Sequence, residues 1–213
     1  MKIALIGATG FVGSKLLDEA LRRGHQVTAI VRHPEKLPGS PALIPKATDV
    51  YDPVQVAAAV ADHDVVLSAF NPGWSEPDIQ SLHVKGSRAI VEGVKSAGIR
   101  RLIVIGGAGS LFVAPGVQLV DTPQFPAEWK PGALGARQAL DELRGEQALD
   151  WTSVSPPALL EPGERTGKYR LGGDELLMDG DRPARISVDD LAVAVLDEIE
   201  RPQHSRRRFT VAN

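Results

Sequence analysis

The sequence predicts an α/β fold in which a doubly wound parallel sheet forms a single domain over residues 1–213. Short unbroken apolar runs, typical of strands covered on both faces, alternate along the chain with amphipathic runs of helical spacing. A glycine-rich turn lies between the first strand and the first helix. A chain of 213 residues can bury one full core but has little room for a separate substrate domain.

The first half of the chain repeats the strand–helix pattern. The first expected helix carries Val12, Leu16 and Ala20 on one face. It ends at Gly24, as the third helix ends at Gly98. The expected strands are Ile3 to Ile6, Gln26 to Val31, Leu43 to Lys46, Asp64 to Phe70 and Arg101 to Ile105, and the expected helices are Val12 to Leu21, Pro53 to Ala61 and Ile79 to Ala97. This alternation predicts parallel strands with helices on both faces of the sheet.

The pattern loosens after residue 106. Residues 107–127 form a loop rich in glycine and proline, and loops of this length are typically functional or mobile. Residues 158–185 hold only short strand-like pieces, such as Tyr169 to Leu171. The other expected elements are a helix from Ala133 to Leu149, a sixth strand from Trp151 to Ser155, a last helix opened by a capping box of Ser187 and Asp190, and a final edge strand from Arg207 to Val211. No linker or repeat divides the chain.

The composition excludes several classes of function. Lysine plus arginine number 24 and aspartate plus glutamate 27, and this net charge of −3 gives no field for binding nucleic acid or an anionic membrane surface. The absence of cysteine excludes disulfides, a thiolate nucleophile and cysteine-based zinc sites, and the five histidines show no metal-ligand spacing. The first strand reaches Gly7 too soon for a secretory signal. We expect a cytoplasmic protein that acts on a small molecule, as a monomer or a small homo-oligomer.

The segment Gly7-Ala8-Thr9-Gly10-Phe11-Val12-Gly13 joins the first strand to the first helix. Glycines at this spacing let the chain turn tightly, let the backbone approach a pyrophosphate and let the helix pack closely on the strand. The phosphates then meet the free amides and the positive end of the helix dipole. The spacing alone is weak evidence, but the strand before it and the helix after it favour a dinucleotide site over a purely structural turn.

The residue after the second strand distinguishes two cofactors. Proteins that bind NAD place an acid there against the ribose 2′-hydroxyl, whereas this chain has Arg32-His33 and no acid before Glu35. A guanidinium suits a 2′-phosphate through charge-assisted bidentate hydrogen bonds. We therefore expect NADP(H) in preference to NAD(H), with a solvated surface arginine as the alternative.

Other strand ends meet at the same carboxyl edge of the sheet, where open α/β sheets bind ligands. The cofactor-binding candidates are Asp49 and Val50 after the third strand, Ala69, Phe70 and Asn71 after the fourth, and Pro156 after the sixth. Asp49 is equally compatible with a plain loop acid.

Longer stretches of the chain resemble a known family. These stretches are GATGFVG, SAFNPG, HVKGSRAIVEGVKSAGIRRLIVIGGAGS, DWTSVSPPALLEPGERTGKYRLG and ISVDDLAVAVLDEIE. With the Arg32 position, they resemble the atypical short-chain dehydrogenase/reductase proteins, in particular the NAD(P)H-binding group of biliverdin-IXβ reductase/flavin reductase and bacterial NADH-flavin reductases. The resemblance runs from residue 2 to residue 211. It implies a Rossmann-like sheet of strand order 3-2-1-4-5-6 extended by a seventh strand. It also implies a nicotinamide dinucleotide whose phosphates lie around Gly7, Thr9, Gly10, Phe11 and Val12.

The chain departs from this family at the catalytic dyad. Ordinary members of the wider superfamily use a Tyr-x-x-x-Lys pair and a serine, but neither Tyr51 nor Tyr169 is followed by lysine four residues later. The resemblance places Ser110 at the usual position of the serine. It places Trp129-Lys130 where related sequences carry Tyr-Lys.

The missing dyad favours one kind of hydride transfer. Reduction of an isolated carbonyl leaves an alkoxide that needs a positioned acid such as tyrosine. A reduced flavin or quinone is a delocalised anion that takes its proton from water, so orientation and a dry stacking surface suffice. We therefore expect an NADPH-dependent reductase of a flavin (FMN or FAD), a quinone or a similar conjugated acceptor. We expect its acceptor side to be built mainly from residues 107–130 and 158–185.

Five side chains are candidates for shaping that acceptor side. The catalytic candidates are Ser110, as a hydrogen-bond donor, and Lys130, as a partner for negative charge. Phe112, Phe125 and Trp129 are candidate stacking surfaces. Each has a structural alternative, because the serine can satisfy loop backbone groups, the aromatic rings can pin the loop and the lysine can be solvated.

The remaining charged clusters suggest weaker roles. Asp189 and Asp190 lie at a helix start, where acids favour the helix dipole, so we expect capping rather than catalysis. The run from Arg206 to Arg208 is expected to be a solvated part of an edge strand. Arg165 and Lys168 are weak candidates for contact with an anionic acceptor such as FMN.

Two other functions remain open at this point. The lost dyad also permits a non-catalytic protein that senses NADPH or binds it for regulation. A nucleotide-sugar or ketone reductase or epimerase that uses unconventional acids is the weaker alternative.

Overall fold

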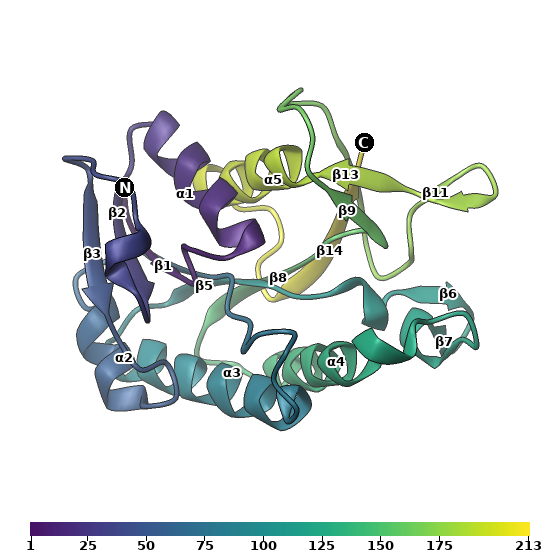
Figure 1. Cartoon of the computed structure of the whole chain (residues 1–213), viewed down its shortest axis with the longest axis horizontal. Coiled ribbons are helices and arrows are strands. Elements are labelled where there is room, and N and C mark those ends of the chain that lie inside the picture. Colours follow the sequence, from purple (N-terminus) through teal and green to yellow (C-terminus); the bar gives the residue numbers. More distant parts are fainter.

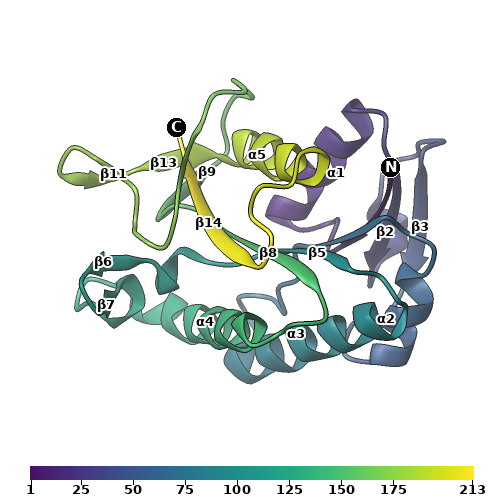
Figure 2. The same ribbon diagram turned by 180° about the vertical axis from the view of Figure 1, so that it is seen from behind.

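The computed structural model describes residues 1–213 and contains one eight-stranded sheet with helices on both faces (Figures 1 and 2). The strand order across the sheet is β10-β14-β8-β5-β4-β1-β2-β3, and only β10 runs antiparallel to its neighbour. The strands are β1 (Lys2–Ile6), β2 (Gln26–Val31), β3 (Leu43–Ala47), β4 (Val65–Ser68), β5 (Arg101–Ile105), β8 (Asp150–Ser155), β10 (Arg170–Gly172) and β14 (Arg207–Ala212). The expected order of the first six long strands is confirmed, and β14 is the expected seventh strand.

Five α-helices cover the two faces of the sheet. One face carries α1 (Phe11–Arg22) and α5 (Val188–Glu200), and the other carries α2 (Pro53–Val60), α3 (Ile79–Ser96) and α4 (Lys130–Arg144) (Figure 1). Along β1, Ile3 and Leu5 join the apolar core under α1 and α5, whereas Ala4 and Ile6 join the core under the other helices. Both faces are therefore buried, which explains why the strands are unbroken apolar runs.

Short strands and 3₁₀ turns lie in the acceptor-side segments and in the loops that connect the long strands and helices. They are β6 (Phe112–Ala114) paired with β7 (Val117–Gln118), β9 (Leu159–Glu161) paired with β13 (Arg185–Ser187), and β11 (Met178–Asp179) paired with β12 (Arg182–Pro183). The 3₁₀ turns are η1 (Pro34–Lys36), η2 (Ala108–Ser110), η3 (Leu119–Asp121) and η4 (Ala127–Trp129). None of the helices combines the length and apolar character that a membrane crossing requires.

Both expected ends of the helix after residue 127 and the expected edge position of the last strand were wrong. Helix α4 begins at Lys130 rather than Ala133, because Pro131 occupies the first turn, where proline is already in helical geometry. It ends at Arg144, and Gly145 follows as its C-terminal cap. Strand β14 is not the edge of the sheet, since β10 pairs with it from Arg170 opposite Ala212 to Gly172 opposite Thr210.

The expected capping box at the start of α5 is only half formed. The Ser187 hydroxyl accepts a hydrogen bond from the Asp190 amide at 3.0 Å. The buried Asp190 carboxylate does not return to Ser187 but accepts from the Thr166 amide at 2.8 Å and the Gly167 amide at 2.7 Å. Burial alone would raise the pKa of Asp190, and these hydrogen bonds outweigh burial and lower it. Asp190 therefore fixes the segment before β10 to helix α5.

Candidate active site

The glycine turn after β1 packs closely against the backbone that follows β4 and against the start of α1. Gly7 has a φ of 82°, and a Cβ on it would lie 2.6 Å from the Ala69 carbonyl oxygen at the end of β4. A Cβ on Gly13 would lie 2.0 Å from the Gly7 carbonyl oxygen. Neither position has room for a side chain, so helix α1 starts against the backbone of the turn.

The start of α1 has no side-chain cap, in contrast to α2 and α5, whose first amides bond to Asp52 and Ser187. Gly10 is the N-cap residue and provides no side-chain hydrogen bond, and the first turn contains no acid. The amides of Phe11, Val12 and Gly13 therefore have neither an intrahelical acceptor nor a side-chain acceptor. Thr9, Gly10 and Phe11 are exposed at the surface. A helix end with free amides and an open approach suits the phosphates of a dinucleotide.

The glycine turn also lies where the strand order reverses. From β1 the chain proceeds through β2 to β3 on one side and later through β4 to β5 on the other. In open α/β sheets, ligands bind at such a switch point, outside the carboxyl ends of the strands. The turn, the uncapped helix and the switch point therefore coincide.

Arg32 follows β2 at this edge of the sheet. Its side chain is exposed and forms no ion pair with a carboxylate. Burial raises the pKa of the Tyr51 hydroxyl, and the positive charge of Arg32 opposes that rise. A guanidinium without a carboxylate partner at this position has the positive charge that binds a ribose 2′-phosphate.

The candidates after β3 have identifiable structural roles. The Asp49 carboxylate accepts a hydrogen bond from the Tyr51 amide at 2.9 Å, a local turn that short acids favour. Val50 is buried in the core under α2 and α3. Pro156, which follows β8, is also buried.

The candidates after β4 turn their side chains inward or onto their own loop. The Phe70 ring packs edge-on against Tyr51, with centroids 5.8 Å apart, and a Cβ on Gly86 of α3 would meet that ring at 2.4 Å. The Asn71 side chain accepts a hydrogen bond from the Gly73 amide at 2.8 Å. Ala69 touches the glycine turn through its carbonyl group. At Ala69 and Phe70, the main chain is thus the part left for a ligand.

Ser110 lies at the end of η2 and is only 5% exposed. Its hydroxyl oxygen and its carbonyl oxygen accept hydrogen bonds from Nη1 of Arg208, at 2.9 and 3.0 Å. The hydroxyl proton of Ser110 remains available for donation, since Ser110 acts only as acceptor toward Arg208. Ser110 is thus held in a fixed place by a charged residue from β14.

The expectation that Arg208 is solvated was wrong. Its side chain is 1% exposed rather than solvated, and its Nε donates to the Asp174 carboxylate at 2.7 Å. Burial lowers the pKa of Arg208, and Asp174 opposes that shift. Strand alternation gives the reason, since Phe209 and Val211 face the core under α1 and α5, and Arg208 therefore faces the other side of the sheet.

The two segments expected to form the acceptor side are joined to each other. The Phe112 amide donates to the Asp174 carbonyl at 2.9 Å, and the Leu176 amide donates to the Phe112 carbonyl at 2.8 Å. On the other side of the loop, a Cβ on Gly109 would lie 2.9 Å from the Ala133 side chain in the first turns of α4. The structure thus brings η2, the start of α4 and residues 174–176 into one neighbourhood.

Exposed aromatic rings gather at the start of α4. Trp129 is 53% exposed, and the adjacent Lys130 is exposed and has no ion-pair partner. Trp74, which follows β4, is 63% exposed and packs on Gly132, whose Cβ would lie 2.7 Å from the indole. Trp74 was not among the predicted site residues, although its position directly after Pro72-Gly73 near a strand end was a usable signal. Phe112 and Phe125 are half-buried in the same loop region.

The interpretation of Arg165 as a contact for an anionic acceptor was wrong. Its Nε and Nη2 both bind the Glu19 carboxylate of α1 at 2.8 Å. Hydrogen bonds from Arg165 lower the pKa of Glu19 to about 2, against the opposing effect of burial and with a further contribution from Arg23. The Arg165 guanidinium is therefore committed to a structural ion pair, whereas Lys168 is exposed.

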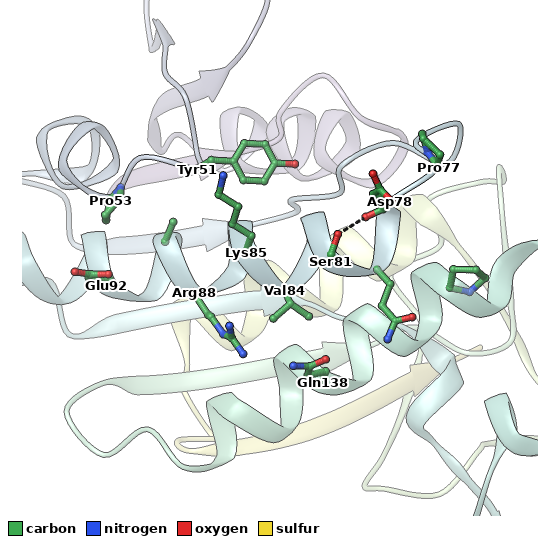
Figure 3. A pocket seen from close by; sticks show the side chains of 13 residues that line it. Tyr51, Pro53, Pro77, Asp78, Ser81, Val84, Lys85, Arg88, Glu92 and Gln138 are labelled. Carbon is green, nitrogen blue, oxygen red and sulfur yellow. Dashed lines mark hydrogen bonds between the residues drawn. The ribbon is translucent and has the colours of Figure 1, made fainter.

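A separate hollow of about 720 Å³ lies over the outer side of α3 (Figure 3). Lys85 lies in it with its Nζ 5.4 Å from the centre of the Tyr51 ring, and Ser81 donates to the Asp78 carbonyl at 3.0 Å. Neither the glycine turn nor Ser110 lines this hollow. Its lining is mainly polar and runs along the outer side of α3.

The residues at the carboxyl edge of the sheet fit a dinucleotide. The cradle at Gly7 and Gly13 excludes side chains, and the amides that open α1 lack acceptors. At the end of β8, the buried Ser155 hydroxyl has no hydrogen-bond partner. Together, the fold and this edge define a Rossmann-type dinucleotide-binding protein.

Comparison with protein families gives the same class. Residues 7–199 match the NAD(P)H-binding family, and the chain belongs to this family. The match begins at the first glycine of the turn and extends through α5.

Three solved structures are similar to the whole chain. One is a Burkholderia pseudomallei protein described provisionally as exported, 47% identical, with 100% of both chains covered and a TM-score of 0.89. Another is a Bacteroides thetaiotaomicron protein provisionally called an epimerase, 45% identical over 99% of this chain and 96% of the other, with a TM-score of 0.93. A third is a Streptococcus pneumoniae protein provisionally called an NADH-flavin reductase, 35% identical over 100% of this chain and 99% of the other, with a TM-score of 0.88. The expectation of an NAD(P)H-binding oxidoreductase of Rossmann-like fold is confirmed.

Proposed function

We propose that the chain is an NADPH-dependent reductase that transfers hydride to a flavin, a quinone or a similar conjugated acceptor. The observation that carries the proposal is the combination of a tight glycine turn and an uncapped α1 with an acceptor side that lacks a Tyr-Lys dyad but exposes indole rings. The Streptococcus pneumoniae relative, provisionally called an NADH-flavin reductase, supports the same choice of acceptor.

The nucleotide side of the proposed site is built from backbone and one guanidinium. Gly7, Gly10 and Gly13 let the main chain approach the pyrophosphate, and the first amides of α1 donate to it. Arg32 binds the 2′-phosphate and so selects NADPH over NADH. When bound, the reduced nicotinamide supplies the hydride.

The acceptor side of the proposed site orients a planar molecule. Trp74 and Trp129 offer ring faces on which a conjugated acceptor stacks. Ser110, fixed by Arg208, donates its hydroxyl proton in a hydrogen bond to an acceptor carbonyl, and Lys130 offsets the negative charge that develops on the reduced ring. The final proton comes from water, because no side chain of suitable acidity lies at Ser110.

Steady-state oxidation of NADPH at 340 nm tests the proposal directly. Purified protein is mixed with NADPH and either FMN, FAD or a small quinone such as menadione. We expect turnover clearly above the uncatalysed reaction with at least one of these acceptors. Tight NADPH binding without turnover of any of them would reject the reductase.

A second candidate function is a protein that binds NADPH without chemistry. The observation that favours it is the burial of Ser110, whose hydroxyl is already bonded to Arg208. Under this alternative, NADPH binds with a dissociation constant that acceptors do not alter, and a partner protein associates in a nucleotide-dependent way. Pull-down with and without NADPH separates the two candidates.

A reductase or epimerase of nucleotide sugars or ketones is the weaker alternative, and the Bacteroides relative's provisional name as an epimerase favours it. The same oxidation assay with a simple ketone, and an epimerisation assay with a nucleotide sugar, would detect it. We also propose a cytoplasmic protein, active as a monomer or small homo-oligomer and with no nucleic-acid or membrane partner. Cell fractionation checks the location.

A further inference from the structure

A pocket of about 570 Å³ is lined in part by Arg208 but not by Ser110. Its lining also includes Arg144 from the end of α4, Asp174, His204, Arg206 and Arg207. No residue of the glycine turn, nor Arg32, lines this pocket. It is therefore distinct from the proposed nucleotide site.

The pocket carries an excess of positive charge. Arg144, Arg206, Arg207 and Arg208 line it, and Asp174 is its one carboxylate. Asp174 is shared, since it binds Arg144 at 2.9 Å as well as Arg208. Outside the lining, Asp141 lies 3.4 Å from Arg144, and Glu198 binds His204 at 2.7 Å. Arg206 and Arg207 have no carboxylate partner at all.

Arg206 is held in a fixed and unusual conformation. Its φ is 51°, the left-handed region that residues with a side chain rarely adopt. Its Nε donates to the Leu149 carbonyl at 3.2 Å, and its Nη2 donates to the Gln147 carbonyl. One edge of the guanidinium is thus bound to the main chain, whereas Nη1 has no partner. A guanidinium fixed in advance loses little entropy when it binds an anion.

We propose that this pocket binds the phosphate group of a small organic phosphate. Planar guanidinium groups bind phosphate oxygens through paired hydrogen bonds. Among the lining arginines, Nη1 of Arg206 and the guanidinium of Arg207 have no protein partner and are the groups left to bind an anion. A volume of about 570 Å³ exceeds what an inorganic ion needs and lies within the range of small-molecule sites. Leu171, which is 45% exposed at the rim, offers an apolar surface for the organic part.

Isothermal titration with inorganic pyrophosphate tests the proposal. The variant is Arg144→Gln/Arg207→Gln, which removes two charges from the pocket and leaves Arg206 and Arg208 in their structural roles. The matched control is Arg100→Gln/Arg185→Gln, which removes two exposed charges outside the pocket. We expect the pocket variant to bind pyrophosphate at least tenfold more weakly than wild type, and the control to bind within about twofold of wild type.

Gly13→Ala identifies binding at the nucleotide site, because its Cβ would lie 2.0 Å from the Gly7 carbonyl oxygen in the turn where the pyrophosphate of the nucleotide is proposed to bind. If inorganic pyrophosphate occupies the arginine pocket instead, this variant binds it with unchanged affinity. Loss of binding in Gly13→Ala, equal affinity in the pocket variant, or equal loss in the charge-matched control would each overturn the proposal. If the double variant melts at a lower temperature than wild type, Arg207→Gln alone provides the test, because Arg207 has no ion-pair partner whose loss could destabilise the fold. Unchanged pyrophosphate affinity in that single variant would equally overturn the proposal.

Discussion

Substitution of Gly13 by alanine tests the close contact on which the nucleotide turn depends. A Cβ at this position would lie 2.0 Å from the Gly7 carbonyl oxygen, 2.8 Å from its carbonyl carbon and 3.1 Å from Cα of Ala8. All three are backbone atoms, so no side chain can rotate away to relieve the overlap. The contact to oxygen has to open to at least ~3.4 Å, which requires helix α1 and the turn to separate by more than ~1 Å.

Two consequences of that separation can be measured. Overpacking of a tight contact costs about 1–3 kcal/mol, so the free energy of unfolding in urea should fall by that amount. A displacement of about 1 Å also moves the first amides of α1 away from the phosphates, and NADPH should bind about 10- to 100-fold more weakly. Titration followed by nicotinamide fluorescence reports the affinity.

Gly10→Ala is the matched control in the same turn. A Cβ on Gly10 would lie 3.4 Å from the Gly7 carbonyl oxygen, with no closer contact, and Gly10 has a φ of −78° that alanine adopts freely. This variant should unfold within about 0.5 kcal/mol of wild type. If Gly13→Ala binds NADPH as tightly as wild type does, the close contact does not hold the nucleotide site and the reasoning is refuted.

Three further predictions concern acid stability, acceptor binding and cofactor choice. Because Arg165 and Arg23 lower the pKa of Glu19 from 4.5 to about 2, their ion pairs with Glu19 stabilise the fold above pH 4.5 and are lost as the pH falls toward 2. Wild type should therefore exceed Glu19→Gln by about 3 kcal/mol at pH 7 and by progressively less below pH 4.5 in urea titrations, and a pH-independent difference would contradict this. Trp74→Ala should raise the KM for FMN or menadione about 2- to 10-fold without changing NADPH affinity, whereas Val54→Ala, a change at another exposed apolar residue, on α2, should alter neither. Arg32→Ala should weaken NADPH about 10- to 100-fold and leave NADH unaffected, and an unchanged ratio of their dissociation constants would remove the role given to Arg32.

The central sheet could be predicted because its strands are buried on both faces. A strand such as Lys2–Ile6 must be apolar at successive positions, which produces an unbroken run in the sequence. The glycine turn could be predicted for a related reason, since Gly7 and Gly13 stand where no side chain fits. In both cases a property of the single residue, its apolar side chain or its lack of a side chain, determines where it lies in the fold.

The acceptor side could not be predicted to the same depth, because its order comes from contacts between distant residues. Arg208 and Ser110 are 98 positions apart, and nothing in the run from Arg206 to Arg208 indicates which of its members is buried. Arg165 bonds to Glu19 across 146 positions. Residues 158–185 contain few apolar side chains, so their positions depend on such polar pairs rather than on periodicity.

The two edges of the sheet determine how copies of this protein can associate. At one edge, β3 carries Pro45, which has no amide proton to donate, followed by Lys46. At the other edge, β10 is only three residues long and runs against the direction of β14, so it offers little backbone for a further strand. Neither edge is a template for continuing the sheet into a neighbouring molecule. Association between copies would therefore use helix or loop surfaces. The sheet edges disfavour strand pairing between molecules, by which an exposed parallel edge can form a larger sheet or a fibre.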